Sequence, residues 1–205
     1  LAGKRVLVPS SGDNIAVFAF HLLGAQVVST DFSQKQLDNA KRIADARQWT
    51  ISFLRQNSME LADIPKGTFD LVYASNGVHV WIPRLDQMYA AFYRALKEGG
   101  SCLFFETHPF IRPFDSGGPE IKVKKDYDDT AAFGDPPNYH WKVQDLVNNF
   151  VGAGFRLEGM EEFHGERDEL PNYSWWYDSI EEAEADSYAK LDWRKNAWAA
   201  LPQWI

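Results

Sequence analysis

The stretch Val6-Leu-Val-Pro-Ser-Ser-Gly-Asp-Asn14 decides the fold. It opens with a short apolar run typical of a buried strand and closes with residues that favour turns. Residues 15–23 are apolar and predict a buried helix, which Gly24 can end. A strand, a turn and a helix in this order predict the first unit of a parallel α/β sheet.

The same alternation continues along the chain. Further strands are predicted at 26–31, 51–55, 68–74 and 101–108. A helix capped by Ser33 follows the second strand, and a helix that begins near Pro83 and ends at Gly99-Gly100 precedes the fifth. Strands that alternate with helices imply right-handed crossovers and a mostly parallel central sheet covered on both faces.

The alternation breaks after the fifth strand. Residues 109–140 are rich in proline and glycine and lack periodicity, which predicts a lid-like insertion over the carboxyl edge of the sheet. A helix over 143–151 and a sixth strand over 155–163 follow, then an aromatic and acidic C-terminal extension over 164–205 with a helix near 180–192. We expect one domain over 1–205.

Composition excludes several classes of protein. The net charge of −8 disfavours nucleic-acid substrates, and no apolar run is long enough for a membrane span. The single Cys102 and the lack of a signal peptide favour a cytoplasmic protein, although a leading segment could precede Leu1. Ten of the 29 acidic residues lie in 161–187, either as a solvated surface or as a rim that attracts a cationic substrate.

Ligands of such sheets bind beyond the carboxyl ends of the strands. Gly12 lets the backbone approach a ligand there, and Asp31, 19 residues later, can accept both hydroxyls of an adenosine ribose. Phe32 can pack on adenine, and Asn57 can bond its edge. Together these residues predict an adenosine site.

These motifs resemble those of the class I S-adenosylmethionine-dependent methyltransferases. Residues 6–14 resemble the first motif of that family, residues 24–33 the second strand with its ribose-binding acid, and residues 96–105 the entry to the fifth strand. The resemblance implies a Rossmann-like three-layer sandwich that binds S-adenosylmethionine and releases S-adenosylhomocysteine. It places the cofactor against Pro9, Ser10, Ser11, Gly12, Asn14, Asp31, Phe32, Asn57, Ser58, Met59, Ser75 and Asn76.

The sequence departs from the family pattern in places. Ser10 and Asn14 replace the outer two glycines of the first motif, Val8 stands where an acid is common, and Asn57 replaces an acid. The last strand of the family's sheet would follow residues 201–205, so we expect that strand to be truncated in this sequence.

Residues near the ends of the fourth and fifth strands and after the insertion are candidates for an acceptor pocket. We expect a small organic acceptor methylated on oxygen or nitrogen by in-line displacement, with His108 or else His140 as a general base, or with either histidine purely structural. No metal site, nucleic-acid partner or membrane partner is expected, and the protein would be a monomer or homodimer. The predicted pocket comprises His79, Trp81, Glu106, Tyr139 and Trp141.

Two alternatives remain open. A methyltransferase-like protein without catalysis would fit the altered loop. A nicotinamide-dependent oxidoreductase would use Asp31 equally well, but the chain lacks the Gly-x-Gly-x-x-Gly and Tyr-x-x-x-Lys patterns.

Overall fold

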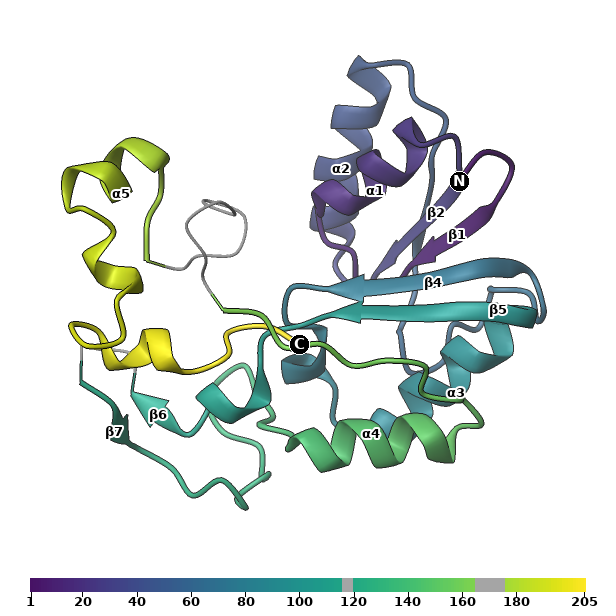
Figure 1. The fold of residues 1–205 in the computed structure, drawn as a ribbon. Helices are drawn as coiled ribbons and strands as arrows, with labels where there is room; N and C mark the ends of the chain where they lie inside the picture. Colours follow the sequence, from purple (N-terminus) through teal and green to yellow (C-terminus); the bar gives the residue numbers. More distant parts are fainter. Residues whose placement is uncertain (116–119, 165–175) are drawn as a thin grey trace.

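The predicted parallel sheet is confirmed. The computed structural model describes residues 1–115, 120–164 and 176–205. Its central sheet has five parallel strands in the order β3-β2-β1-β4-β5 (Figure 1). The order reverses direction at β1, which is the point where ligands of open α/β sheets bind. The strands are β1 (Arg5–Val8), β2 (Gln26–Asp31), β3 (Ser52–Arg55), β4 (Phe69–Ser75) and β5 (Leu96–Phe105).

Helices cover both faces of this sheet, as a three-layer sandwich requires. Figure 1 shows α1 (Ile15–Leu22) and α2 (Gln34–Ala46) on one side, and α3 (Leu85–Ala95) and α4 (Val143–Gly152) on the other. Each side has its own buried apolar cluster against the sheet. Val6, Leu7 and Val8 of β1 are at most 1% exposed, because the central strand is buried on both faces.

The start of β5 differs from the prediction. Gly99-Gly100 was expected to end the preceding helix, but α3 ends at Ala95 and both glycines lie inside β5. The pairing of β4 with β5 shifts register between Phe69 and Leu71. A Cβ atom on Gly100 would lie 3.0 Å from the Lys97 carbonyl oxygen, so this irregular stretch of strand favours glycine.

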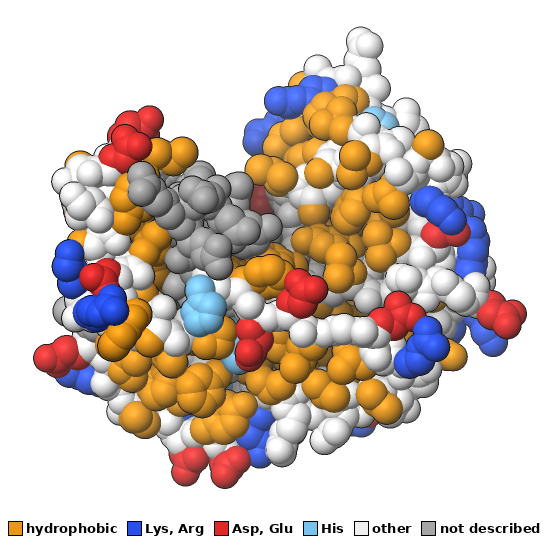
Figure 2. Space-filling model, viewed as in Figure 1, with side chains coloured by type: hydrophobic (Ala, Val, Ile, Leu, Met, Phe, Trp, Pro, Cys, Tyr) orange, Lys and Arg blue, Asp and Glu red, His pale blue; other side chains and the backbone are white. Residues whose placement is uncertain are grey.

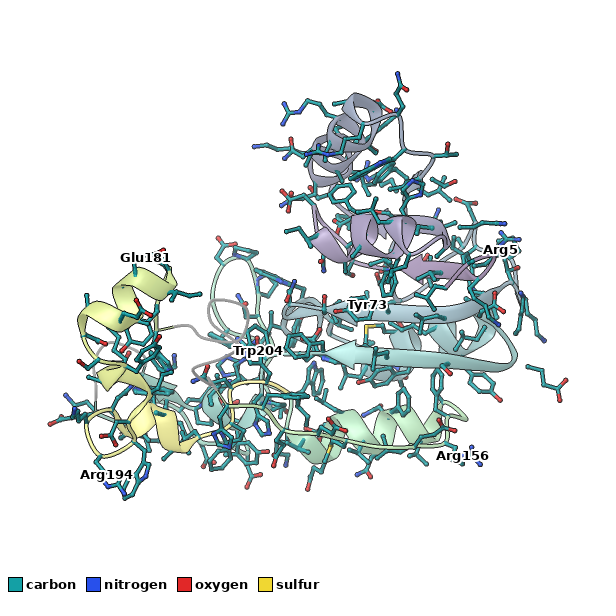
Figure 3. All side chains as sticks on the ribbon, turned by 45° about the horizontal axis from the view of Figure 1, so that its top comes forward. Arg5, Tyr73, Arg156, Glu181, Arg194 and Trp204 are labelled. Atoms are coloured by element: carbon teal, nitrogen blue, oxygen red, sulfur yellow. The ribbon has the colours of Figure 1, made fainter. Side chains whose placement is uncertain are left out.

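The predicted sixth strand over 155–163 is wrong. Of this segment only Phe163 makes a bridge, with Trp204. Residues 203–205 instead enter between the end of β5 and Phe163, where Glu106 and Ile205 exchange two backbone hydrogen bonds of 2.8 Å. Figure 3 shows Trp204 beside the end of β5, where its ring stacks on Phe105 at 4.9 Å.

Elsewhere β5 and the segment after α4 remain apart. A groove of about 1760 Å³ separates β5 from residues 154–161, so the backbone of this segment has no neighbouring strand to pair with. Leu103 on β5 is 53% exposed. Figure 2 shows hydrophobic side chains gathered over α1, β4 and β5 on this side of the molecule.

The insertion and the C-terminal extension lie beyond the carboxyl ends of the strands (Figure 1). The insertion contains a 3-10 turn, η2 (Pro109–Ile111), and a small antiparallel pair, β6 (Phe114–Asp115) with β7 (Lys122–Val123). The helix expected near 180–192 appears as α5 (Ile180–Ala185) and η4 (Ala189–Leu191), and η5 (Ala197–Ala200) follows. Figure 2 shows the molecule hollowed between this extension and the layer of α1 and α2.

Part of the predicted acidic stretch, residues 165–175, lies outside the described residues. Over the rest of the chain, no helix has the length and apolar character that a membrane crossing demands.

Candidate cofactor and acceptor site

The loop after β1 has the backbone form that glycines usually supply. Ser10 adopts a φ of +48° and Gly12 a φ of +53°, so the serine occupies the left-handed region at a position where the family pattern has glycine. The Ser11 N–H donates to the Thr30 carbonyl over 2.9 Å, which ties the loop to β2. A Cβ atom on Gly12 would meet nothing within 4 Å, so open space for a ligand lies above the loop.

Asp31 lies at the end of β2, next to this loop. Its Oδ2 accepts from the Gly12 N–H at 2.8 Å, and its Oδ1 accepts from the Ser33 N–H at 2.7 Å. Each oxygen keeps a further lone pair, and the side chain is only partly buried. The carboxylate therefore fits a ligand that presents two neighbouring hydroxyls, as an adenosine ribose does.

The adenine side of the predicted site is partly exposed. Phe32 is 69% exposed, and the Arg55 guanidinium lies 5.3 Å from its ring centroid. Asn57 uses its amide within its own turn, where Oδ1 accepts from the Met59 N–H and Nδ2 donates to Glu60. Its amide thus keeps only one lone pair and one hydrogen for the adenine edge that we expected it to bond.

Ser58 and Ser10 connect the adenine side with the loop after β1. Their hydroxyl oxygens lie 2.7 Å apart and share a hydrogen bond. Pro9 and Ser11 are buried beneath this contact. The predicted cofactor residues of the first three strands therefore form one continuous edge.

Asn14 connects the loop to β4. Its Oδ1 caps α1 by accepting from the Ala16 N–H, and its Nδ2 donates to the Ser75 hydroxyl, both over 2.8 Å. Asn76 follows with a φ of +64° and an exposed side chain. The asparagine that replaces a family glycine thus fixes the helix start against the strand end predicted to meet the methionyl amino group.

His79 and Glu106 form a buried cluster on the acceptor side. His79, in η1 (Val78–Trp81), has its Nε2 2.8 Å from the Tyr89 hydroxyl and its Nδ1 3.6 Å from Glu106 Oε2. Burial raises the pKa of Tyr89 well above its usual value, so the phenol stays protonated beside Nε2. Glu106, only 2% exposed, also accepts from the Val78 N–H at 3.1 Å.

Tyr139 and Trp141 form the opposite wall. Their rings stack at 6.1 Å, the Tyr139 N–H donates to the Val80 carbonyl, and Trp141 Nε1 donates to the Ile82 carbonyl, both over 2.9 Å. These contacts hold the chain after the insertion against η1. Trp81, predicted as a fifth pocket residue, is 55% exposed and does not line the small cavity that the other four line.

His108 has both ring nitrogens occupied. Nδ1 accepts from the Phe110 N–H at 3.1 Å, which leaves the proton on Nε2, and Nε2 donates to Glu162 over 2.7 Å. The side chain is 2% exposed, and its backbone N–H donates to the Gln203 carbonyl. These contacts favour a structural role over the predicted role as a base.

His140 has a buried Nδ1 that finds no hydrogen-bond partner within the described ranges 1–115, 120–164 and 176–205. Its ring packs on Phe133 at 4.2 Å. Burial, with help from nearby Lys125 and Arg112, lowers the pKa of His140 to about 4. The imidazole is therefore neutral at physiological pH and able to accept a hydrogen bond or a proton.

One residue that sequence reasoning missed is Arg112, which lines the cavity of about 20 Å³ together with His79, Glu106, Tyr139 and Trp141. It is the sole arginine in 109–140, which is the only sequence signal that could have drawn attention to it. Among the described residues no group of three or more potential ligands could hold a metal ion.

Comparison with known proteins places this site in context. Residues 9–100 match the family described as "Methyltransferase domain". A demethylmenaquinone methyltransferase of Thermus thermophilus is 31% identical over 110 residues, which span 53% of this chain and 49% of that protein.

Two solved structures share the fold. An S-adenosylmethionine-dependent methyltransferase from Mesorhizobium loti superposes with a TM-score of 0.73 at 20% identity, over 99% of this chain and 88% of that one. The [4+2]-cyclase SpnF superposes with a TM-score of 0.63 at 19% identity, over 97% of this chain and 67% of that one.

Proposed function

We propose that residues 9–100 form a class I methyltransferase domain whose cofactor is S-adenosylmethionine, and that the protein methylates a small organic acceptor on oxygen or nitrogen. The observation that carries this proposal is the Asp31 carboxylate, held by two backbone N–H groups beside the open loop at Gly12. This arrangement suits the ribose of the cofactor, whose sulfonium supplies an activated methyl group when bound.

The cofactor-binding residues divide by what they would contact. Asp31 would hold the ribose hydroxyls, and Phe32 with residues 57–59 would flank the adenine. Residues 9–12 and the pair Asn14–Ser75 would position the methionine end, close to Asn76. The contacts among these side chains hold the site residues in place, which would limit the ordering entropy lost on binding.

The acceptor side has only a narrow opening. Its four predicted pocket residues are buried or partly buried around a cavity of about 20 Å³, which has room for little more than one water molecule and would admit only the end of an acceptor. In-line displacement needs alignment and exclusion of water more than acid–base chemistry. Where the nucleophile arrives protonated, His140 has the unoccupied nitrogen that could take the proton.

A second candidate is a methyltransferase-like protein that binds the cofactor or a related ligand without transferring a methyl group. The similarity in fold to the [4+2]-cyclase SpnF favours it, since this fold serves more than one chemistry. The residues Ser10 and Asn14 do not add to this candidate, because Ser10 takes a φ of +48° and Asn14 caps α1 and bonds Ser75.

A turnover experiment separates these candidates. The purified protein is incubated with S-adenosylmethionine carrying a labelled methyl group and a panel of small alcohols, phenols, amines and carboxylic acids. We expect label to enter at least one acceptor on oxygen or nitrogen, as identified by mass spectrometry. Tight cofactor binding with no transfer to any acceptor would support the second candidate instead.

A further inference from the structure

Arg112 lies at the junction between the insertion and the sheet. It follows η2 directly, and its backbone N–H closes that turn by donating to the carbonyl of Pro109, the first residue of η2. The side chain runs back toward β4, where Nη2 lies 3.8 Å from the position that a Cβ atom on Gly77 would occupy. Gly77 comes directly after Asn76, so the guanidinium lies beside the predicted methionine end of the cofactor site.

The guanidinium is partly buried yet has no ion-pair partner within 4.0 Å among residues 1–115, 120–164 and 176–205. Arginines removed from water are normally paired with an anion. Burial lowers the pKa of Arg112, and the charge of Glu106 opposes this shift.

Glu106 does not fully serve Arg112. Its Oε1 accepts from the Val78 N–H, and its Oε2 faces Nδ1 of His79. The other nearby cations, Lys124 and Lys125, add positive potential around His140. Lys125 is already occupied, since it donates to the Ala131 carbonyl and pairs with Asp129 at 3.5 Å. Lys124 is exposed to solvent, so the donor capacity that is both unfilled and partly buried at this place belongs to Arg112.

We propose that Arg112 binds a carboxylate of the methyl acceptor, so that the acceptor class is small organic acids. The planar guanidinium presents paired N–H donors that match a carboxylate, which gives orientation as well as affinity. The stacked Tyr139 and Trp141 line the same cavity, which has room for little more than one water molecule, so only the end of the acid that carries the carboxylate would enter it. This inference rests on the proposed methyltransferase function.

The competing role for Arg112 is only to balance the buried charge of Glu106. The two roles differ in what the arginine does for a ligand. A counter-charge would leave acids and their neutral amides equally bound, whereas a carboxylate receptor would prefer the acid.

The experiment uses protein saturated with S-adenosylhomocysteine and follows its titration with matched probes by NMR. The probes are acetate and acetamide, benzoate and benzamide, and malonate and malonamide. We expect at least one acid to bind tenfold or more tightly than its amide, with a shift of the Arg112 side-chain Nε resonance. Arg112→Gln should abolish that preference, Arg112→Lys should keep part of it, and Arg42→Gln, an exposed arginine on α2, should keep all of it.

Equal binding of every acid and its amide would overturn the proposal, as would an unchanged preference in Arg112→Gln. Should Arg112→Gln fail to fold, the Arg112 resonance in the wild-type protein decides, because an acid that leaves it unmoved does not bind there. Failure of S-adenosylhomocysteine to bind in the first step would instead count against the proposed function, so the two failures are distinguishable.

Discussion

The Gly12 N–H donates to Oδ2 of Asp31 over 2.8 Å and joins the loop after β1 to the end of β2. With the Ser33 N–H on Oδ1, this bond sets the orientation of the carboxylate. A hydrogen-bond acceptor that is already held in place loses less entropy on binding than a mobile one. The loop and the acid therefore act as one unit at the centre of the candidate site.

Asp31→Ala removes the carboxylate that would accept hydrogen bonds from the ribose hydroxyls and that accepts one from the Gly12 N–H. We expect the affinity for S-adenosylhomocysteine to fall at least tenfold, which corresponds to about 1.4 kcal/mol. Asp31→Asn keeps one acceptor oxygen and should give an intermediate loss. The control is Asp45→Ala on the exposed face of α2. Calorimetric titration that finds wild-type affinity in Asp31→Ala would refute the ribose assignment.

Asn14 combines a helix cap with a tie to Ser75, and two variants separate these roles. Asn14→Ala loses both, and its free energy of unfolding should fall by about 1 kcal/mol, the usual cost of a lost cap. Asn14→Ser keeps a capping hydroxyl but cannot reach Ser75. It should therefore unfold like the wild type in urea while binding the cofactor product more weakly. Equal affinity of Asn14→Ser and wild type would show that the tie does not position the methionine end.

His108 is expected to stabilise the fold rather than move a proton. His108→Asn places an acceptor near the Nδ1 position but loses the contact with Glu162, at a cost of about 1 kcal/mol in unfolding free energy. With any acceptor that is turned over, kcat should stay within a few-fold of wild type. A fall in kcat of about 100-fold or more, the size typical of a lost general base, would restore the catalytic role.

His140 should make stability depend on pH. Its folded pKa of about 4 lies below the unfolded value near 6.5, so below pH 6.5 the unfolded chain binds the extra proton. This contribution is complete above about pH 6.5 and is lost as the pH falls toward about 4. Urea melts across this range should show that the free energy of unfolding depends less on pH in His140→Gln than in wild type. His164→Gln, which changes an exposed histidine, is the control. Parallel curves for His140→Gln and wild type would contradict the assignment.

The sequence was enough to predict the elements whose neighbours are close along the chain. The five parallel strands and the position of Asp31 at the end of β2 follow from apolar runs and turn residues. Ser10 and Asn14 depart from the family's glycines, but a pattern of letters does not show that serine can take a positive φ or that asparagine can cap a helix and reach β4.

What could not be predicted depends on contacts between distant segments. Residues 155–163 have the composition of a strand, but a strand forms only where a partner offers hydrogen bonds, and only Phe163 finds one. Gly99-Gly100 resembled a helix end because the register shift against β4 is invisible in one strand alone. Arg112 became a candidate only when the fold brought it beside Gly77.

The most direct test of the account is calorimetric titration of the wild-type protein with S-adenosylhomocysteine and, separately, with NAD. The preformed contacts of Asp31, Asn14 and Ser58 predict saturable one-to-one binding of S-adenosylhomocysteine in the micromolar range or tighter, with no detectable heat from NAD. Binding of NAD in preference to S-adenosylhomocysteine, or of neither by folded protein, would contradict it.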